Sequence, residues 1–308
     1  MVNLDMTEQR NILIFGKNGQ VGYELCRSLS YLGKVVAVDV DECDLTDRNA
    51  ILKSLTRYKP DIIANAAAYT AVDKAEEEPE LAEKLNALAP KTMAEWAADN
   101  KALMVHYSTD YVFDGTKKTP YTEEDKPNPL NVYGKTKLQG DQYIQASDCD
   151  HLIFRTSWVY GTRGKNFYLT MRRLLLEKEA IPVVNDQYGT PTWCGTIAHV
   201  TSLVLAQLSL AITLGVDTRK ISGIYNLTNS GKTTWYNFAD AIYRSLHNEK
   251  PTTRLARIVP ISTKEYPTPA PRPAYSVLSG QKLYRAQQIK APEWNEQLKR
   301  CINGKLDF

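Results

Sequence analysis

The chain has 308 residues, of which 43% are hydrophobic and 24% charged. This composition is typical of a folded soluble protein and excludes disordered, collagen-like and coiled-coil chains, while the length allows one large domain or two smaller ones. Lysine and arginine (38) nearly balance aspartate and glutamate (35), so a net charge of +3 without a long basic run predicts no nucleic-acid partner.

The apolar runs, cysteines and histidines indicate a cytoplasmic protein without a membrane anchor or a bound metal. The longest apolar stretches that we identify, such as 12–15 and 61–68, are far shorter than the roughly 20 residues of a membrane helix. The polar N-terminus lacks the pattern of a secretory signal. Five scattered cysteines indicate neither a disulfide framework nor a zinc site, and we interpret the four scattered histidines as structural or surface residues.

Short apolar runs alternate with longer helical patterns over the first half of the chain. Most runs are apolar throughout, as expected for parallel strands that are covered on both faces. One helical pattern spans 80–100, with an apolar face formed by Leu81, Leu85, Leu88, Trp96 and Ala97. The alternation predicts an α/β protein with a doubly wound parallel (Rossmann) sheet. Its strands are expected at 11–15, 34–40, 60–68, 102–108 and 151–157.

A glycine-rich turn follows the first predicted strand. Gly16, Gly19 and Gly22 are spaced G-x-x-G-x-x-G, and a helical pattern begins directly after them. Such a turn lets the backbone approach a pyrophosphate and directs helix N-terminal amides at it. Asp39 lies about 20 residues later, where a carboxylate accepts hydrogen bonds from an adenosine ribose. Asp39 would repel a 2′-phosphate whereas Lys17 would attract one, so the choice between NADH and NADPH stays open.

Tyr133 and Lys137 form the candidate catalytic pair. They are four residues apart and share one face if the segment is helical. A phenol with a pKa of about 10 is a poor acid-base group at neutral pH, but a neighbouring ammonium favours the phenolate. Thr109 follows the fourth predicted strand, at the carboxyl edge where such sheets bind ligands. Its hydroxyl can hold a substrate oxygen beside the tyrosine, which predicts proton exchange with a carbonyl or alkoxide.

The second half of the chain is less regular. Helical patterns cover 167–179, 196–214 and 235–247, and the proline-rich segment 266–273 excludes a helix or a central strand. We interpret this half as a smaller, discontinuous α/β substrate-binding domain. The expected division is a dinucleotide-binding domain over 1–160, a segment at about 193–228 that returns to it, and a mainly substrate-binding domain over 161–308.

The glycine turn, Asp39, Thr109 and the Tyr133/Lys137 pair occur in the order found in the extended short-chain dehydrogenase/reductases. Within that family the chain resembles the dTDP-4-dehydrorhamnose reductases over essentially its whole length after residue 10. The resemblance implies that NADPH or NADH delivers hydride to C4 of a dTDP-4-dehydro-6-deoxy-L-sugar, giving dTDP-L-rhamnose for cell-surface polysaccharides. It is carried by the strings HYSTDYVFDG (106–115), NPLNVYGKTKLQG (128–140), FRTSWVY (154–160), NDQYGTPT (185–192) and TPAPRP (268–273).

The resemblance also implies individual roles. Tyr133 protonates the C4 alkoxide, Lys137 lowers the tyrosine pKa and binds the nicotinamide ribose, and Thr109 hydrogen-bonds the carbonyl oxygen. The cofactor-binding residues are Gly16, Gly19, Gln20, Val21, Gly22, Asp39, Asp44, Leu45, Ala68, Tyr69 and Thr70, together with Tyr133 and Lys137. The substrate-binding residues are Thr109, Asp110 and Trp158, with Asn185, Asp186, Gln187 and Arg272 as further candidates.

Other functions stay open from the sequence alone. A nucleotide-sugar epimerase uses the same three groups with permanently bound NAD, and the β subunit of methionine adenosyltransferase resembles these reductases while regulating another enzyme. A 4,6-dehydratase is disfavoured because Asp110 is followed by Tyr111 and not by a glutamate. Some reductases of this type are described as metal-bridged dimers. Glu24 would be one ligand, but Gly195 stands where a second carboxylate is expected, so we predict no essential metal and either a monomer or a homodimer.

Overall fold

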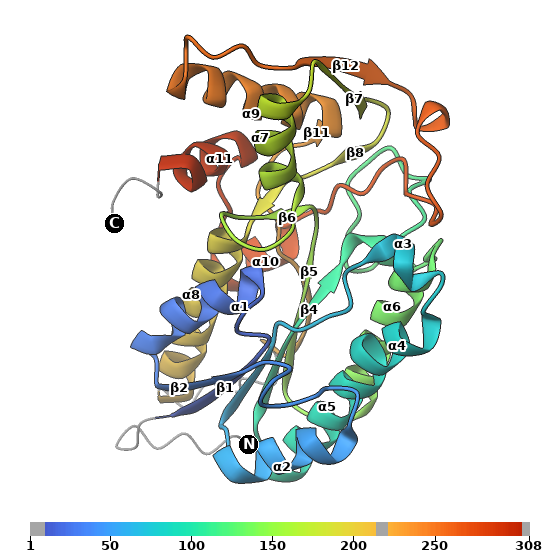
Figure 1. Ribbon diagram of the computed structural model, residues 1–308. Helices are drawn as coiled ribbons and strands as arrows, with labels where there is room; N and C mark the ends of the chain where they lie inside the picture. Colours follow the sequence, from blue (N-terminus) through green and yellow to red (C-terminus); the bar gives the residue numbers. More distant parts are fainter. Residues whose placement is uncertain (1–9, 214–220, 304–308) are drawn as a thin grey trace.

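A computed structural model describes residues 10–213 and 221–303 and shows, within them, a six-stranded parallel sheet (Figure 1). The strand order is β10-β5-β4-β3-β1-β2, and the direction of winding changes at β1. The predicted doubly wound sheet is therefore confirmed, and β10 is a strand that the sequence analysis did not predict. The strands are β1 (Asn11–Phe15), β2 (Lys34–Val38), β3 (Ile62–Asn65), β4 (Leu103–Thr109), β5 (His151–Thr156) and β10 (Gly223–Asn226).

Strand β1 lies between β3 and β2 and is apolar throughout because both of its faces are covered. Ile12 and Ile14 belong to the hydrophobic cluster shared with helices α1 and α8, whereas Leu13 and Phe15 belong to the cluster shared with α2 and α5. Figure 1 shows these helix layers on opposite sides of the sheet. The helices are α1 (Gln20–Ser28) and α8 (Cys194–Thr213) on one face, and α2 (Arg48–Tyr58), α5 (Ala89–Asn100) and α6 (Val132–Ala146) on the other.

The pattern predicted as one helix over 80–100 is divided by a π-helical turn. Helix α4 (Pro79–Glu83) leads into this turn (Lys84–Leu88), which leads into α5. The wider turn changes which residues face the core. The predicted apolar face is therefore wrong at Leu81 and Leu88, which are 36% and 40% exposed. Leu81 and Leu85 line a cavity beside Gly16 instead of the protein core.

A second unit packs around its own hydrophobic cluster, in which Tyr160, Tyr168, Phe238 and Leu298 are buried. Figure 1 shows it as the upper layer of the molecule. The predicted helices of this half are present as α7 and α9, and 266–273 is neither helix nor strand, as expected. The unit contains α7 (Phe167–Glu177), α9 (Trp235–Glu249), α11 (Trp294–Asn303) and the pairs β6 (Val159–Tyr160) with β9 (Thr192–Trp193), β7 (Ala180–Val184) with β12 (Arg257–Ile261), and β8 (Tyr188–Gly189) with β11 (Thr233–Thr234).

Helix α8 is more apolar than the stretches that the sequence analysis identified. In the described part of the chain it alone has the length and composition to cross a membrane, over Cys194–Ala211 with a mean hydropathy of 1.4. However, 56% of this window is buried inside the protein, and Ile197, Val204 and Leu205 lie in the cluster shared with β1. These contacts are those of a core helix. The predicted helix end at 214 lies outside the described residues.

Leu13 provides a test of the core. We expect Leu13→Ala to lower the free energy of unfolding by about 2–5 kcal/mol, because loss of this fully buried side chain would leave a cavity between β1 and the helices that cover it. The matched substitution Leu203→Ala, on the outer side of α8 at 53% exposure, should change the stability by less than about 0.5 kcal/mol. Denaturant titrations of both variants measure the difference, and equal losses would contradict the assigned core.

Candidate active site

The glycine turn joins β1 to α1 through backbone contacts that leave no room for side chains. Gly16 has a φ of +87°, and a Cβ there would lie 2.8 Å from the Ala67 nitrogen. A Cβ on Gly22 would overlap the Gly16 carbonyl oxygen. Gly19 is the N-cap of α1, and no side chain within the described residues caps these first amides. The turn therefore offers a close backbone approach and available N–H groups, as a pyrophosphate requires.

A cavity of about 310 Å³ opens beside this turn. It collects predicted cofactor residues from three strand ends, namely Gly16, Asp39, Asp44, Leu45 and Ala68. Apolar side chains, including Leu81 and Leu85, form the other wall. A flat apolar wall with carboxylates at the rim fits an adenosine, so the residues present fit a dinucleotide.

The acidic rim of this cavity carries more hydrogen bonds than the sequence predicts. The Asp39 carboxylate accepts from the Asn18 and Val40 amides at 2.8 and 2.9 Å. Glu42 accepts from the Asp39 amide at 2.9 Å and forms an ion pair with Lys17. The hydrogen bond to Glu42 raises the pKa of Lys17, and the pKa of Glu42 is lowered correspondingly. The sequence analysis missed Glu42, although a carboxylate three residues after Asp39 is a common turn pattern.

The other predicted cofactor residues lie around the same turn. Gln20 accepts a hydrogen bond from Asn166 at 2.8 Å, which joins α1 to the second unit, and Val21 packs on the core cluster. Tyr69 exchanges hydrogen bonds with the side chain of Asn86, while its hydroxyl donates to Glu78. The bond to Glu78 raises the pKa of Tyr69 to about 12. Thr70 is exposed.

Thr109, Tyr133 and Lys137 are brought together at the carboxyl end of β4. Thr109 is the last residue of β4, and its hydroxyl lies close enough to Tyr133 to act on the pKa of the phenol. Helix α6 starts at Asn131, which caps the Gly134 amide at 2.8 Å, so Tyr133 and Lys137 occupy its first two turns. Burial raises the pKa of Tyr133 to about 12 and lowers the pKa of Lys137 to about 8. Tyr133 is thus held as a phenol, the form that a proton donor needs.

Lys137 is buried against β4 and contacts a histidine that the sequence analysis assigned no role. Its Nζ donates to the Tyr107 carbonyl at 2.6 Å and lies 3.0 Å from His106 Nε2. Asp141, one helical turn later, accepts from Ser108 at 2.8 Å and pairs with Arg155 at 3.4 Å. Strand alternation places His106 and Ser108 on one face of β4. From this alternation the sequence could have predicted that His106, like Ser108, faces α6.

Asp110 follows Thr109 directly and is almost completely buried. Its Oδ1 accepts a hydrogen bond from the Thr109 hydroxyl at 3.2 Å. Burial raises its pKa to about 7, and its Oδ2 has no hydrogen-bond partner among the described residues. Asp110 can therefore donate a proton or accept a hydrogen bond beside Thr109. The sequence analysis predicts that it binds the substrate.

Trp158 is held by a second tryptophan that the sequence analysis did not identify. Its backbone has a φ of +46°, which is unusual for a bulky residue, and its ring stacks on Trp235 with centroids 3.5 Å apart. A Cβ on Gly189 would overlap the Trp158 ring, so this glycine is required by the stack. The pairing fixes the Trp158 ring as a flat surface near the second cavity, which Trp235 lines.

This second cavity has a volume of about 490 Å³. Arg272 and Gln187, two of the four further substrate candidates, line it, together with Tyr111. Arg272 pairs with Asp73 at 2.8 Å, and the Tyr111 ring meets the Tyr133 ring edge-on at 5.8 Å. The other two candidates are engaged elsewhere. Asn185 accepts from Thr234, and Asp186 accepts from the Thr263 amide.

Metal ligands are not grouped in the described ranges 10–213 and 221–303. No cluster of three histidine, cysteine, aspartate or glutamate side chains occurs there, and no disulfide is formed. A Cβ on Gly195 would overlap the Trp193 ring, so Trp193 occupies the space that a carboxylate at this position would need.

Comparison with known proteins fits this geometry. The family described as "RmlD substrate binding domain" matches residues 10–306. A Burkholderia thailandensis protein named dTDP-4-dehydrorhamnose reductase is 45% identical over 298 residues, covering 96% of this chain and 99% of its own. The chain belongs to the dTDP-4-dehydrorhamnose reductase family. The family resemblance inferred from its sequence motifs is thereby confirmed.

Solved structures of the family have the same fold over nearly the whole chain. The dTDP-4-dehydrorhamnose reductase of Clostridium acetobutylicum superposes with a TM-score of 0.86 at 39% identity, covering 96% of this chain and 99% of its own. The Bacillus anthracis dTDP-4-dehydrorhamnose reductase, solved in complex with NADP, superposes with a TM-score of 0.85 at 32% identity and the same coverage. The fold described above is therefore that of the family.

Gly22 tests the glycine turn. Because a Cβ there overlaps Gly16, we expect Gly22→Ala to displace α1 and to weaken NADPH or NADH binding by about tenfold or more. Gly280→Ala is the matched control, since a Cβ at Gly280 meets nothing within 4 Å. Fluorescence titration with each cofactor measures affinity, and thermal unfolding reports folding. Unchanged cofactor affinity in a folded Gly22→Ala protein would contradict the site.

Proposed function

We propose that this protein reduces the C4 ketone of dTDP-4-dehydro-L-rhamnose (dTDP-4-dehydro-6-deoxy-L-mannose) to dTDP-L-rhamnose with NADPH or NADH, in the biosynthesis of rhamnose-containing polysaccharides. The convergence of Thr109, Tyr133 and Lys137 at the carboxyl end of β4 carries the proposal. One cavity adjoins the glycine turn, and the other is lined by Tyr111, whose ring contacts Tyr133. Family membership and the complete catalytic trio favour reduction over a purely regulatory role.

A nicotinamide cofactor held at the glycine turn would supply the hydride that C4 of the sugar receives. Tyr133 transfers its phenolic proton to the C4 oxygen, so that the ketone becomes an alcohol and the tyrosine becomes a phenolate. Thr109, which ends β4 beside Tyr133, holds that oxygen in line with the proton. The buried Lys137 stabilises the phenolate that remains, because an ammonium interacts strongly with an anion away from water.

The remaining assignments are part of the same proposal. We assign the pyrophosphate to the turn from Gly16 to Gly22, the ribose to Asp39, and the adenine to Asp44 and Leu45. Ala68, Tyr69 and Thr70 border the cofactor on its far side, whereas Asp110 and Trp158 contact the sugar nucleotide. We keep the division into a cofactor domain (1–160, with 193–228) and a substrate domain (161–308), supported by the packing of α8 on α1 and of β10 on β5. A cytoplasmic, metal-independent monomer or homodimer completes the proposal.

The direct test is to supply dTDP-4-dehydro-L-rhamnose with NADPH and with NADH in separate reactions. We expect stoichiometric oxidation of the nicotinamide and a product with the C4 configuration of L-rhamnose. Purified protein that carries NAD and turns over without added cofactor would indicate an epimerase. Absence of any NAD(P)H consumption, with another protein co-purifying in equal amount, would indicate a regulatory subunit.

Tyr133→Phe tests the proton donor. We expect kcat to fall by a factor on the order of 10² or more, because a positioned general acid is lost, while the affinity for the cofactor stays unchanged. Tyr143→Phe is the control on the same helix, since its hydroxyl accepts only a hydrogen bond from Gln139 among the described contacts. Steady-state kinetics decide the outcome, and near wild-type turnover in Tyr133→Phe would exclude the assignment.

A further inference from the structure

The proton positions around Lys137 are restricted by a backbone amide that follows β3, the strand next to β4. The Ala67 N–H can only donate, and it points at Asn65 Oδ1 at 3.2 Å. Its direction fixes the orientation of the Asn65 amide, because a flipped amide would set donor against donor. Asn65 Nδ2 then faces His106 Nδ1 at 3.2 Å and must donate to it. In the arrangement that satisfies this bond, His106 Nδ1 carries no proton.

The other ring nitrogen must then carry the proton. A neutral imidazole has one N–H, so His106 has it on Nε2, which lies 3.0 Å from Lys137 Nζ. An N–H needs a lone pair as its acceptor, and only the uncharged form of Lys137 has one. The uncharged amine still donates to the Tyr107 carbonyl at 2.6 Å. In this state the three hydrogen bonds that join Asn65, His106, Lys137 and Tyr107 each run from a donor to an acceptor.

The charged form of Lys137 does not fit the same arrangement. An ammonium must donate to Nε2, which forces the ring proton onto Nδ1, opposite the Asn65 NH₂ group. A buried donor without an acceptor costs about 1–3 kcal/mol. We propose that His106 is a positioning residue whose ring tautomer changes together with the charge of Lys137, and that its bond to Asn65 opposes that charge.

Other charged groups act on Lys137 from the same helix and from the neighbouring strands. Asp141 on α6 favours the ammonium, but it is shared with Arg155 on β5. Tyr133 lies one turn before Lys137, and Asp110 acts on Tyr133. Burial lowers the pKa of His106 well below its ordinary value and that of Lys137 to about 8. The ring is therefore neutral over the range in which Lys137 gains or loses its proton.

The coupling between the His106 tautomer and the Lys137 charge does not depend on what the protein does. Its effect on activity rests on the proposed reductase function. Reduction needs Lys137 charged, because the ammonium stabilises the phenolate of Tyr133. The Asn65–His106 hydrogen bond would then set the pH above which Lys137 loses this charge. A bond between two uncharged side chains would thus control the alkaline limit of activity.

Nitrogen NMR of the free protein tests the tautomer directly. The chain has four histidines, and His106 is identified by elimination with His151→Gln, His199→Gln and His247→Gln, none of which is fully buried. Between about pH 6.5 and about pH 9.5, we expect the proton to move from Nδ1 to Nε2 in one step while the ring stays neutral. The same tautomer at both ends of the range would overturn the proposal, whether or not the protein is a reductase.

Asn65→Asp reverses the restriction with little change in shape. One carboxylate oxygen keeps the Ala67 bond, and the other accepts from Nδ1–H, so the ammonium form of Lys137 is fully bonded. We expect the Nδ1–H tautomer at every pH, and an alkaline limb of kcat/KM that lies higher by about one pH unit or more. In the double variant Asn65→Asp/His106→Phe the upward shift should be lost. An equal shift in both variants would show that the new charge acts without the ring, which would refute the coupling.

Discussion

The burial of the Lys137 amine constrains the whole centre of the molecule. An amine that is 1% exposed remains stable only where polar atoms meet it, and here these atoms are the Tyr107 carbonyl and His106 Nε2 of β4. Helix α6 therefore packs on β4 through hydrogen bonds as well as apolar contacts. The same docking brings Tyr133 to Thr109 at the strand end. A displacement of α6 would separate Tyr133 from Thr109 and would also remove the hydrogen-bond partners of the Lys137 amine. The contacts that stabilise the helix therefore also position Tyr133.

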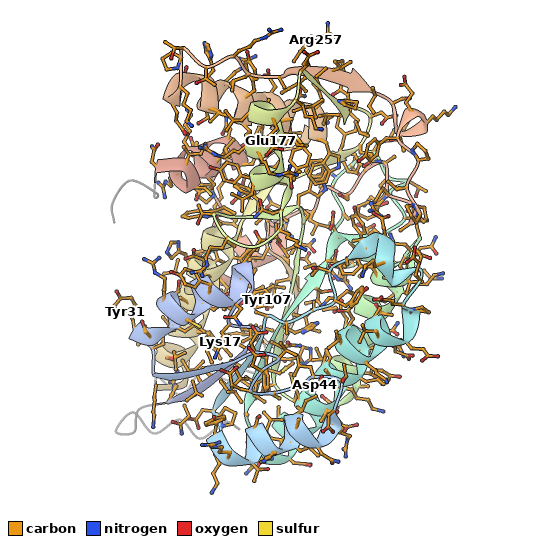
Figure 2. The ribbon with its side chains drawn as sticks, viewed as in Figure 1. Lys17, Tyr31, Asp44, Tyr107, Glu177 and Arg257 are labelled. Atoms are coloured by element: carbon orange, nitrogen blue, oxygen red, sulfur yellow. The ribbon has the colours of Figure 1, made fainter. Side chains whose placement is uncertain are left out.

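Backbone-to-backbone contacts make this positioning rigid. A Cβ on Gly134 would overlap the Tyr111 carbonyl, and a Cβ on Gly140 would overlap the Asn86 carbonyl. These two glycines flank Lys137 on α6, so the helix is held from two sides at main-chain distance. Gly22 holds α1 on the Gly16 turn in the same way, beside the labelled Lys17 in Figure 2. The proposed cofactor and substrate would therefore bind beside helices that main-chain contacts hold in place. A change of side-chain rotamer does not move these helices, and a proton transfer that depends on geometry requires such rigidity.

Local pattern was sufficient to predict the sheet, the glycine turn and the shared helical face of Tyr133 and Lys137. Continuous apolar runs indicate strands that are covered on both faces, and the i, i+4 spacing brings Tyr133 and Lys137 to one face because their segment is helical. Features that depend on long-range docking could not be predicted. The stack of Trp158 on Trp235 joins separate segments of the second unit, and the partner of His106 is known only when α6 is placed on β4. The π-helical turn has no local signal either, which is why the exposure of Leu81 and Leu88 was predicted wrongly.

Each of the two proposed ligand cavities places a cation beside an acid. Lys17 is paired with Glu42 at the cofactor rim, and Arg272 is paired with Asp73 in the second cavity. A phosphate therefore meets nearly balanced side-chain charges, and the backbone supplies much of the attraction, since the N-terminus of α1 carries about half a positive charge. This accounts for a protein that handles anionic ligands with a net charge of only +3. At the rim of the first cavity, Asp39 accepts from two uncharged amides and Lys17 is paired with Glu42, so the one cation does not offset both carboxylates. The backbone N–H groups at the start of α1 are therefore the main source of attraction for a phosphate at this end of the site.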